Sequence, residues 1–85
     1  MVDPMNIKLV EVVDLSHFSY TQAFIALTSS SHQHLELRAD RWVVDAKSIM
    51  GIFSLDVSKP VELWAEVAND AELKSLKDMF AQFKA

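Results

Sequence analysis

The chain has no cysteine, no long apolar run and few basic residues, and each shortage excludes a class of protein. Without cysteine, neither a disulfide framework nor thiol chemistry is possible. No apolar run approaches the roughly 20 residues that a membrane-spanning helix needs. Lys and Arg number 8 against 12 Asp and Glu, a net charge of −4, so no basic stripe is available to bind nucleic acid. The opening MVDPMN lacks the features of a signal peptide, so we expect a cytoplasmic protein.

What the chain does contain is enough apolar material for one core. Hydrophobic residues make up 51% of 85 residues, which predicts a single domain over residues 1–85, with no room for a second. We expect no cofactor and no metal, since no paired-carboxylate motif or glycine-rich phosphate loop is present. His32 and His34 are two potential metal ligands without a third nearby, and we interpret them as a solvated pair.

Alternating apolar and polar residues predict four strands, and helical spacing predicts three helices. The strands are expected at Ile7–Val13, 34–39, 42–46 and 61–67. The first helix lies in the uncharged stretch Leu15–His34, with Asp14 or Ser16 as its N-cap and TSSSHQ, residues 28–33, ending it. The second is the short KSIMGIFSL, in which the lone Gly51 permits a close approach or a tight end. The third is amphipathic and begins at Asn69 or Asp70.

This order, β-α-β-β-α-β-α, predicts an α+β fold: a four-stranded antiparallel sheet with three helices on one face. The other face is expected to be open, carrying charged side chains and the two tryptophans, Trp42 and Trp64. Periodicity also places apolar side chains in the core. The predicted core residues are Phe24, Leu35, Leu37, Ile49, Leu63, Ala65, Leu76 and Phe80.

The stretch AKSIMGIFSL, Ala46 to Leu55, resembles the signature around the regulatory serine of HPr, the histidine-containing phosphocarrier of the bacterial sugar phosphotransferase system. The resemblance extends without a gap through LELRADRWVVDAKSIMG and SLDVSKPVELWAE, from Leu35 to Val67, and continues to Phe83. It implies the open-faced β-sandwich of that family. It also implies a phosphoryl-carrier protein in sugar transport rather than a true enzyme.

His17 lies 31 positions before Ser48, the separation between the family's phosphorylated histidine and its regulatory serine. The resemblance therefore implies that His17 is the phosphoryl acceptor. The family's site reads roughly His-(Ala/Thr)-Arg-Pro-Ala, whereas this chain has HFSYT, with Ser19 for the arginine and Tyr20 for the proline. A helix start still offers N–H donors to a phosphoryl group, but serine cannot supply the charge of a guanidinium. We expect His17 near the start of the helix that carries Ser48. The alternative is that His17 merely begins the first helix.

The family docks enzyme I and IIA-type proteins through the first two helices. By resemblance, the partner-binding residues here are Phe18, Ser19, Gln22, Ile49, Met50 and Phe53. Ser48 has two interpretations: a helix cap, or, by resemblance, a site of regulatory phosphorylation. Two functions follow. The first is a phosphocarrier acting through His17, weakened by the missing arginine and proline. The second is a non-catalytic HPr-like regulatory or protein-interaction module controlled at Ser48.

Overall fold

The computed structural model describes residues 6–85 and contains one four-stranded sheet in which every paired neighbour is antiparallel. The strand order across the sheet is β1-β4-β2-β3. In chain order the elements are β1 (Ile7–Val13), α1 (Phe18–Ser30), β2 (Leu35–Ala39), β3 (Trp42–Asp45), α2 (Ile49–Phe53), β4 (Val61–Glu66), α3 (Asp70–Phe80) and the short 3₁₀ helix η2 (Ala81–Phe83). The predicted α+β fold is confirmed.

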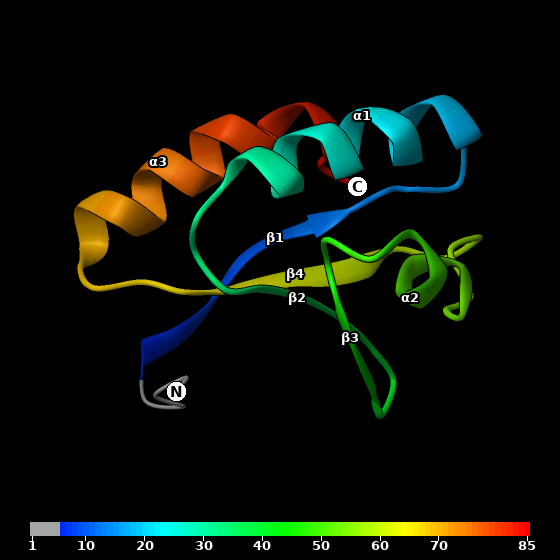
Figure 1. Ribbon diagram of the computed structural model, residues 1–85, viewed down its shortest axis with the longest axis horizontal. Coiled ribbons are helices and arrows are strands. Elements are labelled where there is room, and N and C mark those ends of the chain that lie inside the picture. Colours follow the sequence, from blue (N-terminus) through cyan, green and yellow to red (C-terminus); the bar gives the residue numbers. More distant parts are fainter. Residues whose placement is uncertain (1–5) are drawn as a thin grey trace.

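The long helices α1 and α3 lie side by side over one face of the sheet, and the short α2 lies beside β3 (Figure 1). Aromatic rings join the two long helices, since the Phe24 ring in α1 lies 5.4 Å from that of Phe80 in α3. Phe83 of η2 completes this group with an edge-on contact to Phe24 at 5.5 Å. Apolar burial between helices and sheet is the main stabilising term for such a domain.

Seven of the eight predicted core residues are buried, and Ile49 is not. The buried seven are Phe24, Leu35, Leu37, Leu63, Ala65, Leu76 and Phe80. The prediction for Ile49 is wrong, because 47% of it is exposed. In a helix of only five residues a single side can face the core, and that side carries Ile52, followed by Leu55 just beyond the helix end. Ile49 and Phe53, four residues apart, share the side next to it, which is exposed.

Helix α1 turns two threonines toward the core together with Phe24. Thr21 and Thr28 are fully buried, at the i, i+3, i+7 spacing of one helical face. Each has its hydroxyl satisfied by a backbone carbonyl, which removes the cost of burying it. The helix runs to Ser30, past the Thr28 at which we expected it to end. Neither Asp14 nor Ser16 is its N-cap, so that expectation is also wrong.

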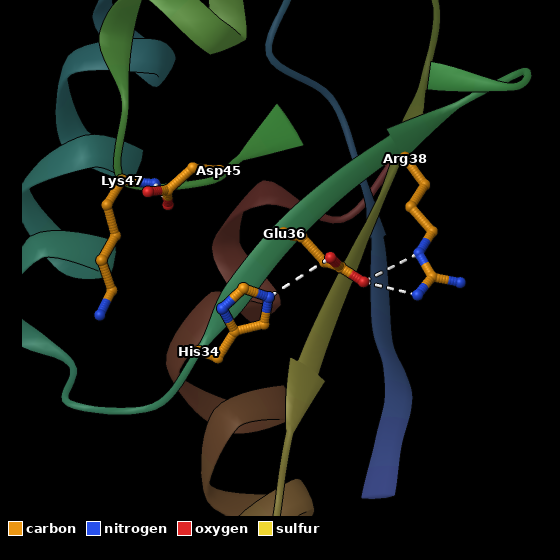
Figure 2. Close-up of polar contacts among 5 residues, drawn as sticks. All are labelled: His34, Glu36, Arg38, Asp45 and Lys47. Carbon is orange, nitrogen blue, oxygen red and sulfur yellow. Dashed lines mark hydrogen bonds and ion pairs between the residues drawn. The ribbon is translucent and has the colours of Figure 1, made fainter. Parts of the chain in front are cut away.

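The face of the sheet away from the helices carries an ordered polar network (Figure 2). Glu36 on β2 lies between Arg38 on the same strand and His34, which directly precedes the strand. His34 Nε2 is 3.3 Å from one carboxylate oxygen, and Arg38 Nε donates to the other at 3.1 Å. The Arg38 guanidinium also lies over the Trp64 ring, 4.3 Å from its centre. Trp64 is therefore half-covered on this face, while Trp42, at the sheet edge, is 62% exposed.

This network sets the pKa of Glu36. Burial by itself raises the pKa of the Glu36 carboxyl, but the hydrogen bonds from Arg38 and His34 outweigh it, so the pKa lies below its ordinary value. Within residues 6–85, no helix is long and apolar enough to cross a membrane.

Candidate functional site: the first turn of α1 and the face of α2

His17 occupies the N-cap position of α1. Its backbone is extended, with φ −103° and ψ 136°, and its carbonyl accepts hydrogen bonds from the N–H groups of Tyr20 and Thr21 at 3.0 and 3.1 Å. Its side chain makes no capping hydrogen bond and is exposed to solvent. The N–H groups of Phe18 and Ser19 precede these first helical bonds and belong to the open end of the helix. The helix start thus places an accessible imidazole beside backbone donors.

Buried and local hydrogen bonds hold this helix start in place. The Thr21 hydroxyl is 3.2 Å from the carbonyl oxygen of Leu15 and 3.4 Å from that of His17, which ties the entry loop to the first turn. In the same loop the Ser16 N–H donates to the Asp14 carboxylate at 2.9 Å. Hydrogen bonds from Ser16, and secondarily the nearby His17, lower the pKa of the Asp14 carboxyl. His17 therefore projects from a loop whose backbone is fixed on both sides.

The Tyr20 ring meets the His17 ring edge to face. The ring centres are 5.1 Å apart and the planes are inclined at 79°. Both side chains are exposed, so the contact lies at the surface of the first turn. No Asp, Glu, Lys or Arg occurs between Leu15 and His34, so α1 itself brings no charge to His17.

Ser48 is the N-cap of α2, as the sequence predicts. Its hydroxyl oxygen accepts a hydrogen bond from the Gly51 N–H at 3.1 Å. The preceding turn is fixed by Asp45, whose carboxylate accepts from the Lys47 N–H at 2.8 Å (Figure 2). Gly51 permits a close approach: a Cβ there would lie 3.3 Å from the Cβ of Val44 on β3 and 3.4 Å from that of Ser48. The missing side chain lets α2 sit directly against the sheet.

Helix α2 starts beside the end of α1 and finishes beside its beginning. The Thr28 hydroxyl donates to the carbonyl of Ala46 at 2.9 Å, and the Lys47 ammonium donates to the carbonyl of Ser31 at 2.8 Å. At the other end, the Phe18 and Phe53 rings stack, with centres 6.4 Å apart and planes inclined at 7°. The first turn of α1, which follows His17, therefore meets the end of α2 rather than its start at Ser48, contrary to our expectation.

The predicted partner-binding residues are all exposed on α1 and α2, which the stacked Phe18 and Phe53 rings bring together, and this set is here called the α1–α2 face. Its large apolar members are all exposed: Phe18 60%, Ile49 47%, Met50 82% and Phe53 51%. Ser19 and Gln22 are also exposed. Large apolar side chains gathered on a surface mark interaction sites. The two helices contribute no formal charge to this face.

The two other histidines do not build a metal centre. His34 is engaged with Glu36, and His32 is exposed. Across the described part of the chain, no three His, Asp or Glu side chains come together to hold a metal ion.

Comparisons with known proteins address the fold. No family model matches the chain, and no curated protein matches it in sequence. Among solved structures, the crystal structure of HPr-C-His from Thermoanaerobacter tengcongensis superposes with a TM-score of 0.63 and 26% identity, covering 89% of this chain and 88% of that one. The chain has an HPr-like fold. The α1–α2 face and the exposed His17, which directly precedes Phe18, are the candidate site.

Sequence reasoning missed several residues that shape this candidate site. Thr21 and Thr28 position α1 through buried hydroxyls, and Lys47 links the start of α2 to the end of α1. The spacing of the two threonines around Phe24 was the available signal, since all three fall on one helical face. The Tyr20 contact with His17 had no comparable signal, because only the helix start shows that both side chains point to the same side.

Proposed function

We propose that this protein is an HPr-like phosphocarrier that accepts a phosphoryl group on His17 and docks its partner proteins through the α1–α2 face. The single observation that carries the proposal is the placement of an exposed, uncapped imidazole at the N-terminus of α1 within an HPr-like fold. A phosphoryl donor can reach that ring without any rearrangement. The partners would be enzyme I and IIA-type proteins of the sugar phosphotransferase system.

The transfer is a nucleophilic displacement at phosphorus. A neutral nitrogen of His17 attacks the phosphorus atom of a phosphohistidine on enzyme I. The new P–N bond forms as the old one breaks, and the donor imidazole leaves with the electron pair of the broken bond. Enzyme I regains its phosphoryl group from phosphoenolpyruvate. Around His17, the N–H groups of Phe18 and Ser19 and the positive end of the α1 dipole favour the negative oxygens.

We expect this transfer to be slow. Ser19 can donate one neutral hydrogen bond, whereas an arginine provides charge and two aligned donors. A hydrogen bond to a charged group contributes about 1.5–3 kcal/mol net. If that contact is made only in the transition state, its absence slows transfer by about 10- to 100-fold. The uncharged α1–α2 face also lacks electrostatic steering, which lowers the association rate with an acidic partner.

The test is labelling from radioactive phosphoenolpyruvate with catalytic enzyme I. We expect slow labelling of the native protein, none in His17→Ala, and faster labelling in Ser19→Arg. Tyr20 is left unchanged, because its N–H bonds the His17 carbonyl and a proline would remove that bond. His32→Ala is the matched control and should label like the native protein. If neither the native protein nor Ser19→Arg labels under conditions that label a standard HPr, the carrier function is refuted.

A second candidate is a non-catalytic HPr-like regulatory or protein-interaction module. It is favoured by the exposed apolar surface of Phe18, Met50 and Phe53, together with the lack of any cation on α1 to hold a phosphoryl group. In this case Ser48, at the N-cap of α2, would be the regulated position. The test is to compare the affinity for enzyme I or another protein partner between the native protein and His17→Ala. Equal affinities, with no labelling of the native protein, would favour this module over the carrier.

A further inference from the structure

We infer that Tyr20 is a positioning residue for phosphorylation: its ring fixes the orientation of the His17 imidazole on the first turn of α1. This inference rests on the proposed role of His17 as a phosphoryl acceptor. It gives a role to Tyr20, which occupies the position where the HPr pattern has a proline.

The geometry that carries the inference is a direct ring contact between residues three apart. Tyr20 and His17 are neighbours on the helix surface, because side chains at i and i+3 lie on the same side. Their centres are 5.1 Å apart, at an inclination of 79°, within the favoured range for edge-to-face pairs. The His17 side chain makes no capping hydrogen bond. Its ring is held by the contact with Tyr20, beside the electrostatic attraction of the nearby Asp14 carboxylate, which sets no ring orientation of its own.

The backbone on both sides of the contact is already fixed. The Tyr20 N–H donates to the His17 carbonyl, and the buried hydroxyl of Thr21, the next residue, lies near the same carbonyl. With the backbone held, the mutual orientation of the two rings depends on the side-chain torsions of His17 and Tyr20. Phe18 cannot perform the same task, because its ring is stacked on Phe53 across the α1–α2 face.

A fixed imidazole matters because the nitrogen must meet phosphorus along one direction. Holding a nucleophile in that direction before the reaction lowers the entropy lost on reaching the transition state. An exposed histidine without a neighbour samples several rotamers and loses that advantage. If the interaction energy of such an aromatic pair is lost from the transition state, phosphoryl transfer slows by about 2- to 10-fold.

The experiment uses two Tyr20 variants and a small phosphoryl donor that needs no docking. Phosphoramidate transfers its phosphoryl group to the imidazole nitrogen as its own P–N bond breaks and ammonia leaves. Labelling is followed at each histidine by mass spectrometry of the alkaline digest. Tyr20→Phe keeps the ring and removes the hydroxyl, while Tyr20→Leu removes the ring and keeps an apolar, helix-compatible side chain. His34, directly before β2, is the internal reference in the same molecule.

We expect Tyr20→Phe to label His17 within about 2-fold of the native rate and Tyr20→Leu to label it about 2- to 10-fold more slowly, with His34 unchanged. In proton NMR spectra, the ring-current shift of the His17 ring protons should persist in Tyr20→Phe and vanish in Tyr20→Leu. If Tyr20 only stabilised the fold, the labelling rate of His17 and the chemical shift of its ring protons would not change together in this way.

Four results would overturn the inference. Three concern His17 alone: a native rate in Tyr20→Leu, an equal slowing in both variants, or no labelling by phosphoramidate in the native protein. Slowing at His34 together with His17 would also overturn it, because that pattern reflects a global change. The proposed function fails separately. If enzyme I labels nothing while the phosphoramidate rates follow the expected pattern, the positioning role stands and the carrier role is lost.

Discussion

Replacing Ser48 separates its capping role from any other role of the hydroxyl. Ser48→Ala removes the oxygen that accepts from the Gly51 N–H at 3.1 Å and leaves that donor, in a partly buried residue, without its acceptor. Loss of an N-cap costs about 0.5–2 kcal/mol, and we expect about 1 kcal/mol here because one bond is lost from a five-residue helix. For a domain of this size that lowers Tm by about 4–8 °C.

Ser48→Asp should behave differently. A carboxylate can accept the same hydrogen bond, and its negative charge is favourable at a helix N-terminus. We therefore expect a free energy of unfolding within about 0.5 kcal/mol of the native value. Urea unfolding followed by circular dichroism and by tryptophan fluorescence measures both variants. Ser75→Ala, on the exposed side of α3, is the matched control and should lose no stability.

The result that would refute this reasoning is the reverse order. If Ser48→Asp unfolds the domain while Ser48→Ala does not, the hydroxyl does not cap α2. The regulatory interpretation of Ser48 would then fail as well, because a phosphate at this position depends on the same tolerance for negative charge.

Two further predictions concern the core and the open face. Phe80→Ala should cost about 3–5 kcal/mol, because Phe80 is fully buried against Phe24, and a loss below about 1 kcal/mol in urea melts would contradict the packing of α3. Because the pKa of Glu36 is lowered in the folded state, its contribution to stability is present above the carboxyl's ordinary pKa and is lost as the pH falls through the folded value. Thermal melts of native protein and Glu36→Gln should therefore converge at acidic pH and separate toward neutral pH, and parallel curves would contradict this linkage.

The sequence alone was sufficient for the order of elements and for most of the core. The alternation in β4 predicts its buried residues Val61, Leu63 and Ala65, because a strand turns every second side chain to the same face. The last helix is equally clear, since Asn69 caps it, accepting from the Glu72 N–H at 2.9 Å. In these segments local pattern and burial agree, so the tertiary structure adds little.

Tertiary structure decided the features for which local pattern is ambiguous. Helix α1 is uncharged and apolar around much of its surface, so several of its faces could have met the core. The spacing of Thr21, Phe24 and Thr28 marked one such face, and packing showed that it is the buried one. Helix α2 has only five residues, too few for periodicity to choose between Ile49 and Ile52. Packing against the sheet settles both cases, because only side chains that fit between helix and strand are removed from water.

In the candidate site, too, some features followed from the sequence and others only from the tertiary structure. The family resemblance made His17 and Ser48 candidates, because their separation matches the family's, and the sequence predicted that Ser48 would cap α2. It could not show that α2 starts beside the end of α1, which places Ser48 away from the first turn at His17. Nor could it show that the Tyr20 ring meets the imidazole. Such relations depend on how two helices cross and where a helix begins, and those are set by the packing of the whole domain rather than by any local run of residues.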